Sequence, residues 1–527
     1  MKFGKLIVLL TLILSFTGCR NSKATYIFLI TLDTMRADAV NYNAENSHTP
    51  NIASLAAGGT TFDNCYSVIP ITLPSHASMF YSQYPHDLRI YNNGQINRVK
   101  YPSLPQIMKR RRFNTGAVIS LGVLKSDFGL DRGFDKYIES FTPSVWTKTA
   151  EEVNRDLFPL IKNMKGGKSF IWAHYSDPHE PYFPPYFDGK FEIWSNKNII
   201  YSISNSLYPL VKKNITLKPG MTTIKFTSKI ASQIKGNPGY NITGITYSDL
   251  LFEPEDPDNT RILYPDNLHL KGSKGKNYFT EDLESDFVIF NNSRRITSVD
   301  LSFLYTLNEE NESKKKLYLE SVKYMDKHIG KLIDFLKKEG ILSKSVILIV
   351  GDHGEGFGEY LDNYGHIHYL NKIYSHVPFI IYGDGIKKGD VRSDLTSNLN
   401  IAPTILEIAG IKKPEFMQGS SVLSSESDNK LILETFSPEA YFDAFSVIEY
   451  PNQIIFYPGR SENRTEYIDL ENDPSGTITD NKNISENSRS KLLKSILSIS
   501  RSITATKGKI GKRKRIHQDI LKSLGYL

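Results

Sequence analysis

Two continuous apolar runs, far apart in the chain, most constrain its fold. Residues 26–32 read YIFLITL and end at Asp33, and residues 345–350 read SVILIV and end at Gly351 and Asp352. A run without polar alternation is typical of a strand that is buried on both faces, as in a parallel sheet between helix layers. Open α/β sheets bind their ligands at the carboxyl ends of the strands. The two runs therefore predict two carboxylates at one edge of a mostly parallel sheet.

The segment before the second run has helical spacing. Apolar residues recur at that spacing from Tyr318 to Leu336, and Gly340 is placed to cap the helix. Strand, helix and strand alternate, which indicates an α/β fold.

Residues 188–310 have a different pattern. They are rich in Asn, Ser, Thr and Gly, and apolar and polar residues alternate in short runs. This predicts a β-rich insertion, for which a plain structural role, carbohydrate binding and a lid over the site all stay open. We expect the remaining chain to form a catalytic α/β domain at 24–187 and 311–425, a small α+β subdomain at 426–485 and a basic helical tail at 486–527.

The first residues predict export. Two lysines precede an apolar run at residues 6–14, which is too short for a membrane span but suits the core of a signal peptide. Residues 16–19 (FTGC) are similar to the lipobox of bacterial lipoproteins, so we expect a signal peptide at 1–18 and a lipid on Cys19. An ordinary cleaved signal and an uncleaved anchor are the alternatives. In each case we expect the protein in the cell envelope, facing the periplasm or the outside.

The charge argues against a nucleic-acid partner. The formal net charge is +7 over 527 residues, and it falls to +5 without residues 1–18. The basic run at 512–515 is interpreted as a solvated tail feature. With Cys19 acylated, Cys65 is alone, so neither a disulfide nor a cysteine metal cluster is expected. The only membrane contact expected is through the N-terminal lipid.

Asp33, Asp352 and His353 carry the first chemical signal. Two hard carboxylates and one imidazole suit Mg, Mn, Ca or Zn. One Asp at a strand end is more often a helix cap than a ligand, but the joint occurrence favours a metal site. Gly351 and Gly354 are expected to let the backbone turn sharply around the Asp-His pair.

Thr72 carries the second signal. It precedes Pro74, which suits the first turn of a helix that runs on through Met79. A hydroxyl there lies beside backbone N–H groups and the positive end of the helix dipole, where a tetrahedral oxyanion can bind. A helix N-cap is the structural alternative, and this segment alone does not separate the two.

Four segments together resemble the sulfatase family of the alkaline phosphatase superfamily: 31–38, 71–79, 177–185, and 351–359 with Gly365-His366. The similarity covers about residues 25–187 and 312–480. It extends to shorter motifs at 128–135 (FGLDRGFD), 324–326 (YMD), 402–404 (APT), 467–474 (YIDLENDP) and 521–527 (LKSLGYL).

The resemblance implies an α/β sandwich around a central, mostly parallel sheet, with one divalent metal bound by Asp33, Asp352 and His353; a second metal is left open. It places Thr72 at the nucleophile position, in contact with that metal. It also implies catalytic or substrate-binding roles for three histidines, each of which would be structural or exposed in the absence of the motifs: His179 in the PHEPY motif, His76 where many members have Arg, and His366.

Three positions depart from the family pattern. Sulfatases carry a Cys or Ser at the position of Thr72 and oxidise it to formylglycine, whereas an oxidised Thr would be a ketone, which hydrates poorly. Thr34 stands where many members have a further acidic ligand. Residues 117–122 (AVISLG) stand where members carry a Lys and a His that contact sulfate.

We therefore expect a metal-dependent hydrolase of sulfate or phosphate esters on a small molecule or glycan. One alternative is a phosphoryl-group transferase that modifies envelope glycans or lipids, because a threonine alkoxide works on phosphorus. Relatives of that kind usually have several membrane spans. The other alternative is an inactive sulfatase-like binding protein, which would not need to keep the metal ligands.

Overall fold

The computed structural model describes most of the chain outside its two ends. The described residues are 25–42, 47–141, 146–180, 182, 190–204, 210–228, 242–270, 278–280, 284–309, 311–424, 429–436, 443–459, 464–473, 475–480 and 483–506. The expected signal peptide, Cys19 and the basic run at 512–515 lie outside them. No described helix is both long and apolar enough to cross a membrane.

An eight-stranded mixed sheet forms the centre of the catalytic domain, in the order β20-β2-β19-β16-β1-β5-β3-β4. Only β19 runs antiparallel to its neighbours; the other pairs are parallel. The strands are β1 (Tyr26–Leu32), β2 (Thr60–Tyr66), β3 (Asn114–Val118), β4 (Lys136–Ile138), β5 (Ser169–Tyr175), β16 (Ser345–Gly351), β19 (Phe379–Gly383) and β20 (Asp390–Ser397).

Helices cover both faces of this sheet, which explains the two apolar runs. Alternate residues of β1 pack into the two hydrophobic clusters on opposite faces of the sheet: Ile27 and Leu29 in one, Phe28 and Ile30 in the other. One face is covered by α3 (Thr72–Tyr81), α5 (Leu104–Arg110) and α10 (Ile401–Ile408), and the other by α2 (Pro50–Ala57), α6 (Ala150–Asn163) and α8 (Asn311–Lys338).

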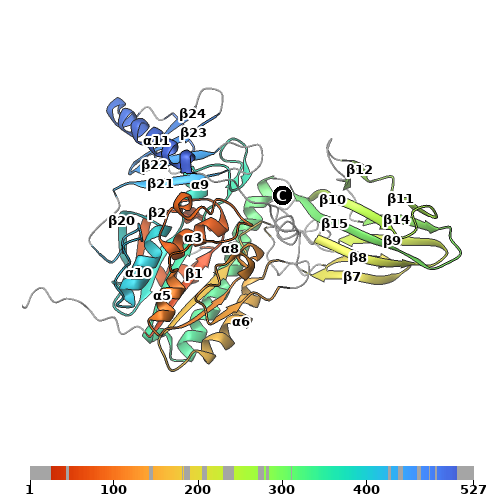
Figure 1. Ribbon diagram of the computed structural model, residues 1–527, viewed down its shortest axis with the longest axis horizontal. Coiled ribbons are helices and arrows are strands. Elements are labelled where there is room, and N and C mark those ends of the chain that lie inside the picture. The colour runs from red at the N-terminus through yellow and green to blue at the C-terminus, as the bar shows by residue number, and fades with distance from the viewer. Residues whose placement is uncertain are drawn as a thin grey trace, which may run out of the picture.

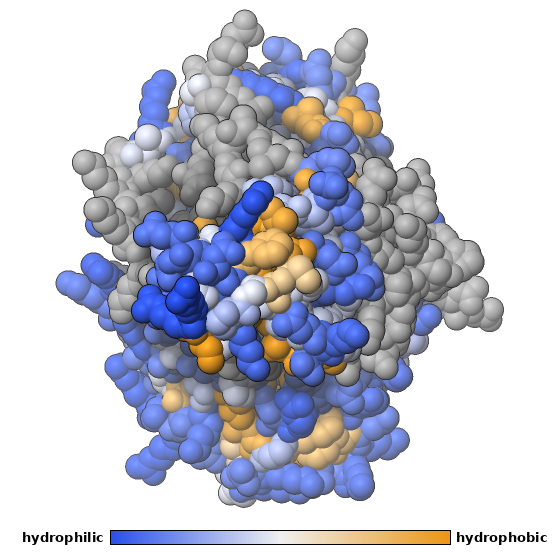
Figure 2. Space-filling view, turned by 90° about the vertical axis from the view of Figure 1, so that its right-hand side faces the viewer, coloured by the Kyte–Doolittle hydropathy of each residue, from blue (hydrophilic) through white to orange (hydrophobic). Residues whose placement is uncertain are grey.

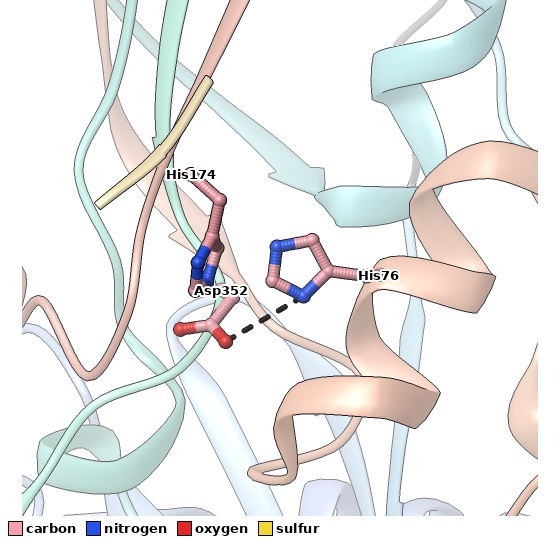
Figure 3. A group of neighbouring side chains, drawn as sticks. All are labelled: His76, His174 and Asp352. Carbon is pink, nitrogen blue, oxygen red and sulfur yellow. Dashed lines mark ion pairs between the residues drawn. The ribbon is translucent and has the colours of Figure 1, made fainter. Parts of the chain in front are cut away.

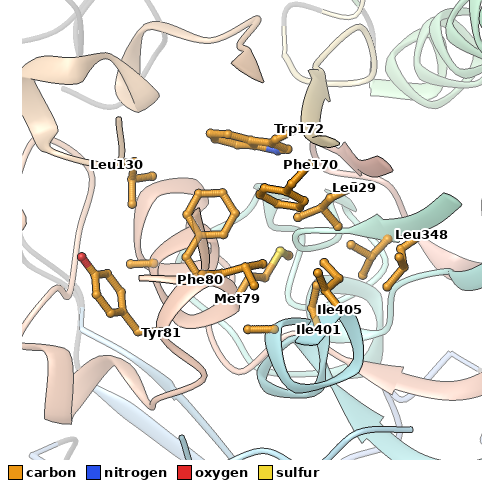
Figure 4. Packing of buried hydrophobic residues seen from close by; sticks show 14 of the residues in the cluster. Leu29, Met79, Phe80, Tyr81, Leu130, Phe170, Trp172, Leu348, Ile401 and Ile405 are labelled. Carbon is orange, nitrogen blue, oxygen red and sulfur yellow. The ribbon is translucent and has the colours of Figure 1, made fainter. Parts of the chain in front are cut away.

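The packing under α3 fixes the helix that carries Thr72. Figure 4 shows Met79 and Phe80 among Phe170, Trp172 and Ile405, which come from β5 and α10. The rings of Phe80 and Trp172 meet edge to face with centroids 4.9 Å apart. All ten residues of α3 are buried, so the helix has little freedom to shift relative to the sheet.

Two five-stranded sheets form a β-sandwich between β5 and α8, and Figure 1 shows it extending away from the catalytic domain. Its core is a separate hydrophobic cluster that includes Phe226, Phe287 and Phe303. The strands are β6 (Lys190–Ser195), β7 (Asn198–Ser204), β8 (Leu210–Leu217), β9 (Gly220–Ser228), β10 (Ile242–Pro254), β11 (Thr260–Leu263), β12 (His269–Leu270), β13 (Tyr278–Thr280), β14 (Glu284–Asn291) and β15 (Thr297–Glu309).

The outer end of the sandwich is mainly hydrophilic. Figure 2 views the molecule from that side and shows a small hydrophobic group near the centre of a mostly hydrophilic face. The exposed large hydrophobic residues of the described sandwich are Ile199, Met221, Leu263, Tyr264 and Ile296.

The C-terminal subdomain is a four-stranded antiparallel sheet packed against a helix. The strands are β21 (Leu431–Thr435), β22 (Ala444–Glu449), β23 (Asn452–Tyr457) and β24 (Arg464–Asp469), and the helix is α11 (Glu486–Thr506). The remaining short elements are α4 (Pro85–Leu88), β17 (Gly356–Phe357), β18 (Tyr364–Gly365), α9 (Lys372–Ser375) and the 3-10 turns Ala37–Ala39, Gly122–Leu124, Ser126–Phe128, Leu342–Lys344 and Asn398–Asn400. The α/β fold class is confirmed; the exact domain bounds stay predictions.

Candidate metal centre and nucleophile

Sheet register places Asp33 beside Asp352. Strands β1 and β16 are parallel, and Leu32 pairs with Gly351 at their carboxyl ends. The backbone N–H of Asp352 donates to the carbonyl of Leu32 at 3.2 Å, which extends this pairing by one residue. The two apolar strands thus end in neighbouring carboxylates, both fully buried.

Each carboxylate has one oxygen that forms hydrogen bonds and one oxygen that forms none. Oδ1 of Asp352 accepts from the backbone N–H groups of Thr34 and His353, at 3.0 and 2.7 Å. Oδ2 of Asp33 lies 3.1 Å from Nε2 of His174. Within the described chain, Oδ1 of Asp33 and Oδ2 of Asp352 have no hydrogen-bond partner. Buried polar atoms of this kind are costly unless something pairs with them.

His353 points a ring nitrogen at the same place. Its Nδ1 lies 3.0 Å from the carbonyl oxygen of Gly354, which can only accept, so Nδ1 carries the proton and Nε2 keeps its lone pair. Nε2 lies 4.0 Å from Oδ1 of Asp33 and 3.5 Å from Oδ2 of Asp352. One donor atom from each of the three residues lies within 4.8 Å of the others. Two orphan carboxylate oxygens and one imidazole lone pair fit a divalent cation.

The ionisation of these residues also favours a cation. Burial raises the pKa of Asp352 well above its ordinary value, and the neighbouring Asp33 raises it further. Burial would also raise the pKa of Asp33, but the hydrogen bond from His174 and the nearby imidazole of His179 outweigh it and lower that pKa. Burial lowers the pKa of His353, which keeps the ring neutral and able to bind a metal. Without a cation, the site disfavours having both carboxylates ionised. A bound cation would stabilise both ionised carboxylates.

Two hydrogen bonds from Thr34 hold the aspartates in place. Thr34 has φ = 53°, an uncommon conformation for a β-branched residue, and this strained turn aims its N–H at Asp352. The Thr34 hydroxyl donates to the carbonyl of Asp33 at 2.8 Å. Thr34 therefore supports Asp352 through its backbone N–H and Asp33 through its hydroxyl.

The backbone bends at Asp352, as expected, but Gly351 and Gly354 are not needed there for a left-handed conformation. Neither is among the residues with positive φ. The structure instead leaves no room for a side chain: a Cβ on Gly354 would lie 2.1 Å from the carbonyl oxygen of Ile373, and one on Gly351 would lie 2.7 Å from that of Met35. Close backbone approach therefore requires glycine on either side of the Asp-His pair.

Thr72 brings its hydroxyl to this group from α3, of which it is the first residue. Its Oγ1 lies 3.2 Å from Nε2 of His353. The hydroxyl of Ser75, one turn further on, donates to the carbonyl of Asp352 at 2.8 Å and ties the helix to the end of β16. The N-cap is Ile71, so the N-cap alternative for Thr72 is wrong.

His76 lies on α3 one turn after Thr72, and Figure 3 shows its ring beside Asp352 and His174. Nδ1 lies 2.8 Å from the carbonyl oxygen of Thr72 and so carries the proton. Nε2 then accepts from the hydroxyl of Thr31 at 3.0 Å, and that hydroxyl accepts from the Trp172 indole at 2.8 Å. Both ring nitrogens are therefore occupied, which makes His76 a support for the first turn of α3.

His179 and His366 lie on another side of the group. The His366 ring is 4.4 Å from that of His353 and 5.4 Å from that of His179, measured between centroids. Nδ1 of His366 lies 3.2 Å from Oε1 of the fully buried Glu355. Burial lowers the pKa of His366, but the Glu355 carboxylate outweighs this and raises it.

Sequence analysis missed two residues of the site, His174 and Glu355. His174 lies near the carboxyl end of the apolar strand β5, four residues before the start of the PHEPY motif, and that position was the available signal. Glu355 lies in the GDHGEG segment itself. Ser120, in the segment that departs from the family pattern, faces His174 with its hydroxyl 2.8 Å from Nδ1.

Comparison with known proteins decides the family. The sulfatase family model matches residues 25–411, and a model described as the C-terminal part of N-sulphoglucosamine sulphohydrolase matches residues 367–501. The chain belongs to the sulfatase family. It is therefore an enzyme of the sulfuric ester hydrolase class in the alkaline phosphatase superfamily.

Individual relatives are distant. The chain is 22% identical to the N-acetylglucosamine-6-O-sulfatase of Bacteroides thetaiotaomicron over 78% of its own length and 73% of that protein. It is 24% identical to the choline-sulfatase of Rhizobium meliloti, over 71% and 65% of the two chains. A solved structure in complex with the substrate D-glucosamine-2-N,6-O-disulfate shares the fold, with a TM-score of 0.60 and 16% identity over 91% of this chain and 98% of that one.

Proposed function

We propose that this protein hydrolyses sulfate or phosphate esters at one divalent metal ion, with Thr72 as the nucleophile. The observation that carries the proposal is the pair of buried carboxylate oxygens without hydrogen bonds, on Asp33 and Asp352, beside Nε2 of His353. The hydroxyl of Thr72 reaches the same group.

Asp33, Asp352 and His353 would hold the metal, and Thr72 would contact it. Ca, Mn, Mg and Zn all accept such ligands. When bound, a divalent cation lowers the pKa of a coordinated hydroxyl and offsets the charge that develops on the ester oxygens.

The chain's own groups suit the remaining steps. Oγ1 of Thr72 forms a bond to sulfur or phosphorus and gives its proton to a water molecule. The bond from that atom to the alcohol oxygen breaks as His366 protonates the oxygen, and His366 then regains a proton from water. The raised pKa of His366 beside Glu355 favours the protonated form that this role needs. Water then cleaves the ester on Thr72, which releases the anion and restores the hydroxyl. His179, whose ring lies next to that of His366, would contact the anion.

A sulfated glycan or small molecule is the first candidate substrate. The names of the two relatives, N-acetylglucosamine-6-O-sulfatase and choline-sulfatase, support it. The absence of an oxidisable Cys or Ser at position 72 favours a second candidate, phosphoryl transfer to water or to an envelope alcohol. A threonine hydroxyl forms an ester with phosphorus that water can hydrolyse at phosphorus.

The test is to measure turnover of aryl sulfate, phosphate monoester and phosphate diester substrates by the purified protein with Mn, Zn, Ca and Mg in turn. Metal-dependent turnover of at least one ester is expected, and mass spectrometry of the quenched reaction should find the anion on Thr72. Full activity in the metal-free protein would contradict the proposal. A catalytically dead protein that keeps its metal would instead support the inactive binding protein.

We also propose that Cys19 carries a lipid that tethers the enzyme to the cell envelope, facing the periplasm or the outside. The basic and apolar start of the chain and the residues before Cys19 support this. Detergent phase partition should place the wild-type protein with the detergent and the Cys19→Ala protein in water. Equal partition of both would contradict it.

A further inference from the structure

His174 is a buried polar residue beside the proposed metal site for which the proposed function has no use. It lies on β5, where the register pairs it with Thr31 of β1, and it is fully buried. Its Nε2 lies 3.1 Å from Oδ2 of Asp33. The ring is therefore placed against one of the three proposed metal ligands, on the oxygen that faces away from His353.

The hydrogen bonds of Ser120 determine the tautomer of His174. The backbone N–H of Ser120 donates to Nδ1 at 3.4 Å, and the Ser120 hydroxyl lies 2.8 Å from the same atom. A backbone N–H can only donate, so Nδ1 is an acceptor and Nε2 carries the proton. Nε2–H consequently donates to Oδ2 of Asp33.

We propose that Ser120 and His174 form a positioning pair that orients Asp33 for the metal. Ser120 fixes which nitrogen of His174 is protonated, and His174 then holds one carboxylate oxygen of Asp33. The other oxygen, Oδ1, is left without a hydrogen bond and faces Nε2 of His353. Residues that hydrogen-bond metal ligands in this way commonly change metal affinity 10- to 100-fold when they are replaced.

A direct role for His174 as a ligand of a second metal fits the structure less well. His76, His174 and Asp352 could supply three donor atoms, and Figure 3 shows them together. However, Nδ1 of His76 carries a proton that points at the carbonyl of Thr72, and Nε2 of His174 carries one that points at Asp33. The nitrogens nearest to the two aspartates are therefore hydrogen-bond donors.

The inference rests on the proposed function, and calorimetric titration of the purified protein with Mn²⁺ tests it. His174→Phe keeps the ring and removes the N–H, and it should weaken Mn²⁺ binding 10- to 100-fold. His174→Gln supplies an amide N–H and should restore much of the affinity. Ser120→Ala keeps the backbone N–H and should lose less than His174→Phe. Saturating Mn²⁺ should recover most of kcat in His174→Phe, because the ligands themselves remain.

His328→Phe is the matched control. His328 is a buried histidine on α8, and its backbone carbonyl accepts from Asn154. The same replacement there should leave the Mn²⁺ affinity unchanged. A purely structural role for His174 would lower the unfolding temperature without changing that affinity, and would overturn the inference.

The other outcomes separate the inference from the proposed function. If Asp33→Ala abolishes Mn²⁺ binding while His174→Phe binds as the wild type does, the proposed function stands and the positioning role falls. Two Mn²⁺ per wild-type chain and one in His174→Phe would make His174 a ligand and overturn the positioning role. A wild-type protein that binds no Mn²⁺, Zn²⁺, Ca²⁺ or Mg²⁺ would remove the proposed function itself.

Discussion

Replacing Asp352 by Asn should make the metal-free protein more stable while it destroys metal binding. The amide keeps Oδ1, which accepts from Thr34 and His353, and removes the second charge from a fully buried site. The carboxylates lie within 4.8 Å of each other, and two unit charges at that distance repel by about 3.5 kcal/mol at an effective dielectric constant of about 20. Holding Asp352 protonated at pH 7 instead, from its ordinary pKa of 3.8, costs about 4 kcal/mol.

Both routes give a similar penalty, so Asp352→Asn should raise the free energy of unfolding by about 2–4 kcal/mol at pH 7 in a chelator. Urea unfolding followed by tryptophan fluorescence measures this. Added Mn²⁺ at 100 times its Kd should stabilise the wild type by about 2.7 kcal/mol and leave the variant unchanged.

Asp326→Asn is the matched control for this experiment. Asp326 is also buried, but its two oxygens accept from the backbone of Ile52 and from the backbone and side chain of Asn51. An amide there loses an acceptor, so the protein should lose about 1–2 kcal/mol. If Asp352→Asn is no more stable than the wild type, or if Asp326→Asn gains as much, the like-charge argument is refuted.

Three further predictions concern the nucleophile, the glycine and the subdomain contact. Thr72→Val keeps the shape of a fully buried side chain and should lower kcat by about 10³-fold or more with an unchanged circular dichroism spectrum; residual activity near the wild-type level would remove Thr72 from the mechanism. Gly354→Ala places a Cβ 2.1 Å from a carbonyl oxygen and should weaken Mn²⁺ binding at least about tenfold. Gly410→Ala strains a backbone with φ of +69° but places its Cβ in open space, so it should bind Mn²⁺ normally. His86 of α4 contacts the buried Glu434 of β21 at 2.8 Å, and although burial lowers the pKa of His86, this carboxylate outweighs it and raises that pKa. The stability that this contact adds is therefore fully present below pH 6.5, and it is lost as the pH rises through the higher pKa of His86 in the folded protein. The free energy of unfolding of the wild type should fall between pH 6 and 8 more than that of His86→Gln. Parallel pH profiles of the two proteins would contradict this.

The central sheet could be predicted because the apolar composition of its strands identifies them in the sequence. Residues 26–32 and 345–350 are apolar except for Thr31 and Ser345 and are buried throughout, as in a strand covered on both faces. The antiparallel direction of β19 had no such signal, because an apolar strand has the same pattern in either direction. The carboxyl ends of β1 and β16 then bring Asp33 and Asp352 together without further information.

The residues that hold the carboxylates in position, His174 and Ser120, could not be predicted from composition. His174 looks like one more residue of a buried strand, and its contact with Asp33 follows from the pairing of β5 with β1. Ser120 lies two residues after β3, the strand that pairs with β5, and reaches His174 only after folding. Spacing in the sequence identifies residues that share an element, but contacts between strands depend on register, which the sequence states only indirectly.

The most direct test of the account is anomalous diffraction from crystals of the wild-type protein soaked in Mn²⁺. The account predicts one strong peak in contact with Oδ1 of Asp33, Oδ2 of Asp352 and Nε2 of His353, with the Thr72 hydroxyl beside it. No peak among these atoms, or a peak that leaves Asp33 or Asp352 without contact, would contradict it.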